Sequence, residues 1–347
     1  MKRVCQSAAR IIMLALCCAL LPVTAAEEPL LRDDHPQEYV VQRGDTLWDI
    51  SARFLRSPWR WPDIWYVNPQ IANPHLIYPG DRLELVYING QPQLRLSRGD
   101  RTVRLSPGVR ATPWDGAIPT IPIDAIAPFL SRPYVLNEGE AEALPYIVDF
   151  GDTHILGGAG NPAYVRSLAE AGGKYHVVRP GDAYRDADTD EVLGYEAAYI
   201  GTVEATRPGD PATVFFNSTQ QESVIGDRLV LVGDERPWTN FIPQRPASTV
   251  EGSIISVVNG VSQIGRYNVV VIDRGAFNGL KPGDVLRIEQ RGRTIRDVVT
   301  PDSRDTVTLP DEQAGHLMVF RTFDRVSFGL VMDATRPLHV LDRVRHP

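Results

Sequence analysis

The sequence predicts a small α+β module of strand, helix, helix and strand, followed by mostly-β domains. Residues 39–86 change from strand-like alternation to helical spacing of apolar residues and back again. From Asn89 onward, short runs with period-two alternation are bounded by glycine or proline. The 28 glycines and 28 prolines among 347 residues are typical of a chain with many turns and short strands. This length predicts two or three domains.

Residues 1–26 predict a secretory signal peptide. They have a basic start, an apolar run over residues 11–21 and a final VTAA stretch before Glu27. The apolar run is shorter than the roughly 20 residues that a membrane-spanning helix needs. We expect cleavage near Ala25 or Ala26 and export to the periplasm.

All the cysteines lie inside this predicted signal peptide, at Cys5, Cys17 and Cys18. The exported chain would therefore have neither disulfides nor cysteine chemistry. A lipoprotein signal is disfavoured because Leu16, rather than a small residue, precedes Cys17.

Residues 27–38 are polar, carry two prolines and predict a linker. A strand over residues 39–42 follows, and Gly44 ends it. Either Asp45 or Thr46 can then cap a helix, because both side chains accept hydrogen bonds from backbone N–H groups.

The first helix is predicted by Leu47, Ile50 and Phe54, which fall on one helical face. Prolines end this helix, and a second helix begins near Asp63. A closing strand starts at Leu83. So small a unit needs large side chains to fill its core, and tryptophans can do this. The segment 59–65 is rich in tryptophan, and its side chains can either stack on a sugar or pack in the core. The four tryptophans are Trp48, Trp59, Trp61 and Trp65.

The remaining chain divides at its proline-rich stretches. Residues 87–133 predict a β segment and a proline-rich linker, residues 134–245 a middle β-rich domain, and residues 246–347 a C-terminal β-rich domain. The boundary between the last two is expected near Pro246.

Two stretches, beginning at Gly181 and Gly283, resemble each other and predict an internal duplication of a small β unit. Each is expected to run from a Gly-Asp turn through two strands to a closing Asp-Arg pair. The expected strands cover residues 198–205 and 212–216 in the first stretch, and 316–322 and 325–331 in the second. The closing pairs are Asp227 with Arg228 and Asp342 with Arg343.

The residues of the first module resemble the LysM motif. The match covers residues 39–85, about one seventh of the chain. It is carried by Gly44, Asp45, Thr46, Leu47, Asn68, Pro69, Ile77, Pro79, Gly80 and Leu83.

The LysM resemblance implies binding of glycans that contain N-acetylglucosamine, chiefly peptidoglycan and chitin. Such a site needs a shallow groove of backbone donors and acceptors rather than a catalytic group. In the alternative interpretation, the same residues only cap the first helix and form a turn. The predicted glycan-binding residues are Gly44, Asp45, Thr46, Leu47, Asn68, Leu76, Ile77 and Tyr78.

Nearly the whole of the exported chain resembles the TsaP-like family of secretin-associated type IV pilus proteins. The stretches that carry this resemblance are GDTLWDIS, RPGDAYRD to VLGYEAAYIGT, and the final AGHLMVFRTFDRVSFGLVMDATRPLHVLDRV. The C-terminal region of that family is similar to a domain of a flagellar basal-body ring protein. The resemblance implies a non-enzymatic tether that joins the cell wall to an outer-membrane secretin, with self-association in a ring.

Apolar residues near the C-terminus can face the domain's own core or a neighbouring chain, and a core role is favoured because strands usually alternate this way. These residues are Val319, Phe320, Phe328, Leu330 and Val331.

The composition argues against several other functions. The formal net charge is −7 and no basic block is present, so nucleic acid is not expected as a partner. The seven histidines are scattered and predict no metal site or other cofactor. Two rival functions remain, a LysM anchor for another envelope machine or general wall maintenance, and a peptidoglycan hydrolase with paired carboxylates.

Overall fold

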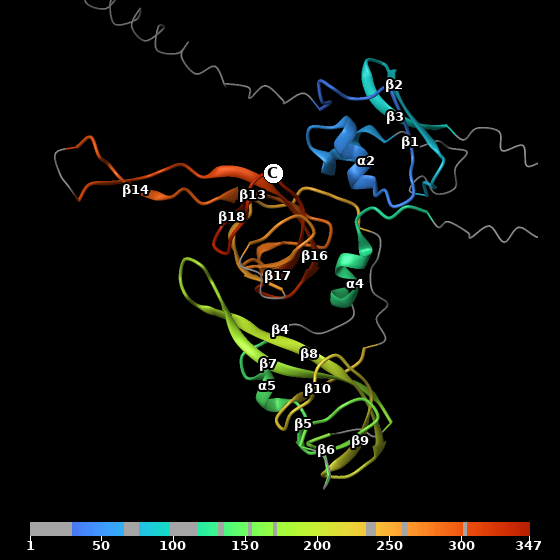
Figure 1. The fold of residues 1–347 in the computed structure, drawn as a ribbon, viewed down its shortest axis with the longest axis vertical. Coiled ribbons are helices and arrows are strands. Elements are labelled where there is room, and N and C mark those ends of the chain that lie inside the picture. Colours follow the sequence, from blue (N-terminus) through green and yellow to red (C-terminus); the bar gives the residue numbers. More distant parts are fainter. Residues whose placement is uncertain are drawn as a thin grey trace, which may run out of the picture.

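The computed structural model describes residues 30–65, 76–97, 117–130, 135–151, 155–168, 172–233, 241–258, 263–300 and 304–347. An N-terminal module, a middle β domain and a C-terminal β-barrel follow one another along the chain (Figure 1). The predicted signal peptide and Asn68 lie outside the described residues. No helix among the described residues is long and apolar enough to cross a membrane.

The N-terminal module has the predicted order of strand, helix, helix and strand. A further strand, β3, forms a hairpin with β2, so the antiparallel sheet has the order β1-β2-β3. The elements are β1 (Glu38–Val40), α2 (Leu47–Phe54), η1 (Pro58–Arg60), α3 (Trp61–Ile64), β2 (Arg82–Ile88) and β3 (Gln91–Ser97).

In the structure, residues on both sides of the predicted module pack against it. Leu31 forms an isolated bridge with Leu55 and packs against the module core, so residues 30–38 are not a free linker. At the other end, residues 91–97 belong to the module sheet rather than to a separate segment. The reason is the Asn89-Gly90 turn, in which both residues have positive φ, 53° and 80°, and which turns β3 back onto β2.

Helix α2 forms where the spacing of apolar residues predicts it. Leu47, Ile50 and Phe54 are buried together in the module core. Thr46 is the N-cap, and its hydroxyl accepts a hydrogen bond of 3.1 Å from the N–H of Asp49. The choice between Asp45 and Thr46 is thereby resolved, because Asp45 braces the preceding turn instead.

The middle domain is an antiparallel sheet in which the pairing of β8 with β9 closes six strands into a ring. Around this ring the order is β5-β6-β9-β8-β7-β10, and β4 adds to β8 outside it. The elements are β4 (Val135–Leu136), α5 (Glu140–Ala143), β5 (Tyr146–Asp149), β6 (Pro162–Arg166), β7 (Lys174–Arg185), β8 (Val192–Arg207), β9 (Ala212–Thr219) and β10 (Arg228–Leu231).

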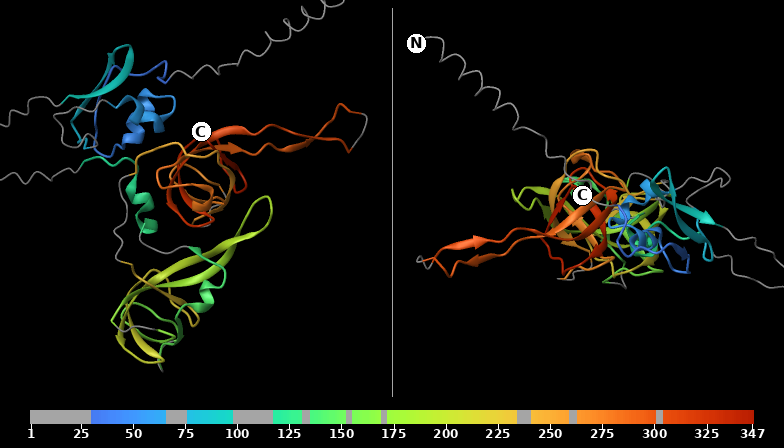
Figure 2. Two further views of the ribbon diagram at one scale, coloured as in Figure 1. Left: turned by 180° about the vertical axis from the view of Figure 1, so that it is seen from behind. Right: turned by 90° about the horizontal axis from the view of Figure 1, so that it is seen from above.

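The C-terminal domain is a closed barrel of the order β11-β12-β17-β16-β13-β18. A hairpin of β14 and β15 extends from it and projects into solvent (Figure 2). The elements are β11 (Glu251–Val257), β12 (Val269–Ile272), η2 (Ala276–Asn278), β13 (Val285–Gln290), β14 (Thr294–Arg296), β15 (Thr306–Thr308), β16 (Glu312–Thr322), β17 (Ser327–Ala334) and β18 (Arg343–Arg345).

When the six ring strands of each β domain are numbered along the chain, the two rings have the same strand order. The strands β14 and β15 are an insertion in the second domain and are left out of this numbering. In both, the buried aspartate before the last strand accepts backbone N–H bonds. Val224 donates to Asp227 at 2.9 Å, and His339 donates to Asp342 at 2.8 Å. The expected Gly-Asp turn is present at Gly283 only, because β7 runs straight through Gly181.

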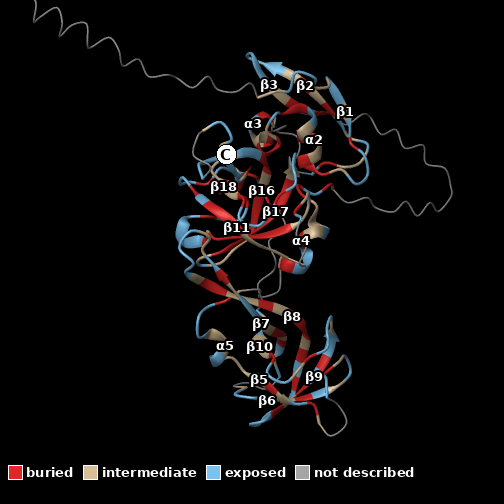
Figure 3. Ribbon diagram, turned by 60° about the vertical axis from the view of Figure 1, so that its left-hand side comes forward, coloured by how far each residue is buried: buried red, intermediate tan, exposed pale blue. Residues whose placement is uncertain are grey.

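Apolar residues of the barrel alternate between its interior and its outer face. On β12, Val270 and Ile272 belong to the interior cluster, whereas Val269 and Val271 belong to a second cluster outside the barrel. Buried positions accordingly follow one another without a break on the central strands (Figure 3). This pattern is typical of strands covered on both faces.

The cluster outside the barrel contains residues of the module, the middle domain and the barrel, and we call it the shared cluster. Trp48 and Trp59 of the module pack in it together with Phe320 and Phe328 of the barrel. The cluster also contains Tyr184 and Leu193 of the middle domain, and Ile121, Ile126 and Phe129 of the intervening segment.

The residues proposed as core or interface are therefore all buried within this chain. Val319 and Val331 lie inside the barrel, whereas Phe320, Phe328 and Leu330 lie in the shared cluster.

Helix α4 (Ile123–Leu130) lies beside the barrel (Figure 1). Its Ile126 and Phe129 are buried in the shared cluster, and the guanidinium of Arg321 donates a 2.8 Å hydrogen bond to the carbonyl of Phe129. The proline-rich linker expected within residues 87–133 thus contains a helix that packs on the barrel. Shortly before the expected boundary near Pro246, Phe241 is buried in the shared cluster.

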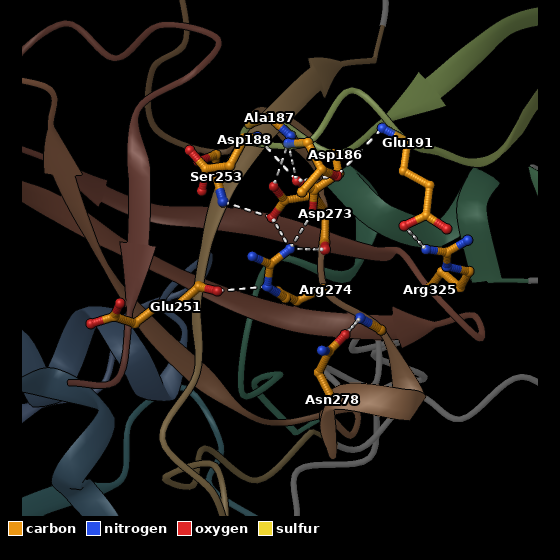
Figure 4. A network of polar contacts seen from close by, with 12 residues as sticks. Asp186, Ala187, Asp188, Glu191, Glu251, Ser253, Asp273, Arg274, Asn278 and Arg325 are labelled. Atoms are coloured by element: carbon orange, nitrogen blue, oxygen red, sulfur yellow. Dashed lines mark hydrogen bonds and ion pairs between the residues drawn. The ribbon is translucent and has the colours of Figure 1, made fainter.

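A polar network attaches the β7–β8 hairpin of the middle domain to the barrel (Figure 4). Asp186 pairs with Arg274 at 2.9 Å, and Arg274 donates a 2.6 Å hydrogen bond to the carbonyl of Glu251. The buried Asp273 accepts hydrogen bonds from the N–H groups of Ser253 and Ala187. Burial opposes ionisation of Asp186, but hydrogen bonds from the backbone of Thr189 and Asp188 and from Arg274 lower its pKa to about 2.

Replacing Trp59 by alanine should lower the free energy of unfolding by about 3–5 kcal/mol, because a large side chain is removed from the shared cluster. Chemical denaturation of the two chains measures this difference. The matched control is Tyr87→Ala, whose side chain is 58% exposed on β2 and whose loss should change stability by less than about 0.5 kcal/mol. Equal effects of the two substitutions on the free energy of unfolding would contradict the placement of Trp59 in the shared cluster.

Replacing Asp186 by asparagine should cost about 1–2 kcal/mol of stability, because the carboxylate holds both its own turn and Arg274. The pKa of Asp186 is lowered in the folded state, so its stabilisation is complete above its ordinary value of 3.8 and is lost as the pH falls towards about 2. The difference in unfolding free energy between wild type and variant should shrink over that range. Asp190→Asn, on an 84% exposed side chain of the same loop, is the control and should change stability by less than about 0.5 kcal/mol.

Candidate functional site

The candidate site lies where two loops of the N-terminal module meet, and we call it the module groove. One wall is the turn over residues 44–47 before α2, and the other is the stretch over residues 76–78 before β2. Two backbone hydrogen bonds beside the groove join these walls. Val41 donates to Asp81 at 2.9 Å, and Gly80 donates to Val41 at 2.8 Å.

The first wall is a tight turn held by Asp45. Its carboxylate accepts a 2.8 Å hydrogen bond from the N–H of Gln42 and a 2.9 Å bond from the hydroxyl of Tyr39. Burial raises the pKa of Tyr39, and the bond to Asp45 raises it further, so the phenol keeps its proton and donates. Gly44 has a φ of +91°, which glycine adopts without strain and other residues rarely adopt.

The second wall is a turn held in the same manner by Asp81. The N–H of Tyr78 donates to its carboxylate at 3.0 Å, and the N–H of Asp81 returns a 3.0 Å bond to the carbonyl of Tyr78. Leu76 is 39% exposed at the groove, whereas Ile77 is fully buried in the module core. Leu76 can therefore offer apolar surface to a sugar ring, and Ile77 can offer only backbone atoms.

The predicted residues thus divide into three kinds. Gly44 and Leu76 are exposed, Asp45 and Tyr78 are half-buried, and Asn68 lies outside the described residues. The side chains that are buried, and that can contribute to a ligand only through backbone atoms or as supports, are those of Thr46, Leu47 and Ile77.

The backbone groups of the groove are bonded to a segment that sequence reasoning missed, residues 117–121. Leu47 donates its N–H to the carbonyl of Pro119 at 3.0 Å, and Trp48 donates to the carbonyl of Thr120 at 3.2 Å. On the other wall, the carbonyl of Ile77 accepts a 2.8 Å bond from the N–H of Ile118. The segment therefore lies across both walls.

The only sequence signal for this segment is a pair of isoleucines, Ile118 and Ile121, inside a proline-rich stretch. Ile118 joins the module core and Ile121 joins the shared cluster. An apolar pair between prolines does not say which distant groove receives it, so the contact could not be predicted from local patterns.

An open pocket of about 430 Å³ remains beside the segment. Gly44, Asp45 and Pro79 line one side of it, and Pro119 and Asp124 line the other. The surface left free for a ligand is therefore made partly by the module and partly by the segment.

The tryptophans of the module serve packing. Trp61 is 2% exposed in the module core, and its ring meets that of Trp65 edge to face with centroids 5.8 Å apart. Trp48 and Trp59 lie in the shared cluster, and the guanidinium of Arg245 lies 5.1 Å from the centre of the Trp59 ring. Of the two roles left open for the segment 59–65, the structure favours the core role.

Helix α2 contacts the barrel with a polar group as well. The carboxylate of Asp49 pairs with Arg266 and accepts a 3.2 Å hydrogen bond from the hydroxyl of Tyr267. Burial and the neighbouring Asp49 raise the pKa of Tyr267. Among the described residues, no group of three or more His, Cys, Asp or Glu side chains is placed to hold a metal ion.

Comparison with known proteins identifies the module. Residues 39–85 match the model of the LysM domain. The chain is also similar to an uncharacterized protein, YqbP, of Bacillus subtilis strain 168, with 37% identity over 60 residues. That similarity covers 14% of this chain and 27% of the relative. LysM is a binding domain, and the match indicates that the module binds peptidoglycan or another carbohydrate.

Proposed function

We propose that this chain is a non-enzymatic periplasmic protein that binds peptidoglycan through its LysM domain and anchors the outer-membrane secretin of a type IV pilus to the cell wall. The observation that carries the proposal is the LysM match over residues 39–85, which coincides with a groove braced by Asp45 and Asp81. Export rests on the signal-peptide pattern of residues 1–26.

The glycan would contact the module groove through few groups. Backbone donors at the start of α2 and the carbonyl of Ile77 suit the acetamido group of N-acetylglucosamine, which has one donor and one acceptor. Leu76 supplies exposed apolar surface for a sugar face. Such a site binds weakly by itself, and many copies on one polymer would supply avidity.

The β14–β15 hairpin is the surface that best suits a protein partner. Within the part of the chain that the structure describes, its two strands pair only with each other, so both outer edges are open. Val298 and Val299 at its end are 82% and 89% exposed. Open edges and exposed apolar side chains are typical of strands that pair with another chain, here a secretin or a second copy in a ring.

We also propose that the two β domains arose by duplication, as the similar sequence stretches suggest. The common order of their ring strands supports this.

Two alternatives make different predictions. A LysM anchor for another envelope machine would bind the wall equally well but would not recover a pilus secretin. A peptidoglycan hydrolase would release soluble muropeptides from purified sacculi, whereas an anchor would sediment with them and release none.

The Leu76→Asp chain should sediment with purified sacculi about tenfold less than wild type, because a carboxylate replaces apolar surface at the groove. The matched control is Ile88→Asp, which changes a 37% exposed isoleucine near the far end of β2 and should sediment like wild type. Equal sedimentation of all three chains would place the glycan site elsewhere.

The double substitution Val298→Asp and Val299→Asp should abolish recovery of the secretin from detergent-solubilised envelopes by the tagged chain, because it places charges on the exposed apolar end of the hairpin. Sedimentation with sacculi should not change. Ile155→Asp, at a 90% exposed position of the middle domain, is the control for added charge. Recovery of wall material without a secretin by the wild-type chain would favour the general anchor.

A further inference from the structure

The module groove has an internal occupant in this structure. Residues 117–121 form hydrogen bonds with both of its walls. In the chain they follow β3, the last strand of the module. We infer that this segment competes with glycan for the groove, so that the LysM domain binds glycan only when the segment has left. This inference rests on the proposed glycan binding and adds its regulation.

The competition follows first from the hydrogen-bonding groups. The first N–H groups of a helix have no partner inside the helix and are free to bind a ligand. In α2, the N–H of Asp49 bonds to the hydroxyl of Thr46, while those of Leu47 and Trp48 bond to Pro119 and Thr120 of the segment. Each N–H donates one bond, so a glycan oxygen can accept from Leu47 or Trp48 only after the segment carbonyls are displaced.

Burial of the segment leads to the same conclusion. Ile118 is 6% exposed and belongs to the module core, beside the carbonyl of Ile77 that its own N–H contacts at 2.8 Å. Thr120 is 8% exposed. The segment is therefore seated in the groove, so a sugar cannot be added to the same groups without moving it.

Each wall of the groove is braced by residues of the module itself. The turn before α2 is braced by Asp45 and capped by Thr46, and the second wall is braced by Asp81. The sheet β1-β2-β3 contains no residue of the segment. These braces therefore stay in place when the segment leaves, and the core loses the side chain of Ile118.

The barrel holds the segment near the groove. Ile121 is fully buried in the shared cluster, and α4 follows directly with Ile126 and Phe129 in the same cluster. Arg321 of the barrel bonds to the carbonyl of Phe129 at 2.8 Å. Because α4 fixes one end of the segment on the barrel, displacement from the groove can be coupled to what the barrel contacts.

The test is a calorimetric titration of an N-acetylglucosamine pentamer into the full exported chain and its variants. Ile118→Asp removes the apolar anchor of the segment and should tighten binding by about tenfold or more, because a larger fraction of the chains has an open groove. Ile118→Ser is a milder change and should act in the same direction. Ile225→Asp, at a 61% exposed site of the middle domain, is the matched control and should bind like wild type.

The outcomes separate this inference from the proposed function. Tighter binding by the two Ile118 variants than by wild type and the control supports competition. Equal, measurable binding by all chains overturns the inference but keeps the glycan-binding function, with the glycan in the pocket beside the segment. Binding by none of the chains overturns both. Circular dichroism shows whether each variant is folded, and if Ile118→Asp unfolds, the result with Ile118→Ser decides.

Discussion

The arrangement of the chain depends on the shared cluster outside the C-terminal barrel. Strands of this barrel are apolar on both faces, so the barrel would expose a wide apolar surface if it stood alone. Trp48 and Trp59 cover part of this surface, α4 covers another part, and the β7–β8 hairpin covers a third with Tyr184 and Leu193. Hydrophobic burial thereby fixes three units that are separated along the sequence.

Helix α2 connects the module core, the barrel and the module groove. One of its faces fills the module core through Ile50 and Phe54, while Trp48 and Asp49 contact the barrel. The start of the same helix forms one wall of the module groove. The groove, its internal segment and the barrel are therefore parts of one continuous structure, so wall binding and contacts of the barrel can influence each other.

Local patterns in the sequence predicted the elements whose causes are local. Thr46 caps α2, and the spacing of apolar residues gives the buried face of the helix, because both depend on neighbours within a turn. The LysM match confirms the module that its motif indicated. The Asn89-Gly90 pair is typical of a hairpin turn, although residues 91–97 are predicted as part of the segment that follows the module. The seat of Ile118 in the groove depends on contacts between distant residues, and no local pattern specifies it.

Hydrogen exchange of the wild-type chain, with and without a saturating N-acetylglucosamine oligomer, tests the central claim most directly. The account predicts that the amide of Ile118 loses protection when glycan binds, because its bond to the carbonyl of Ile77 is broken. The amides of Leu47 and Trp48 should stay protected, because the glycan replaces the carbonyls of Pro119 and Thr120. Glycan binding that leaves the protection of Ile118 unchanged would contradict the account, as would the absence of any change in the module.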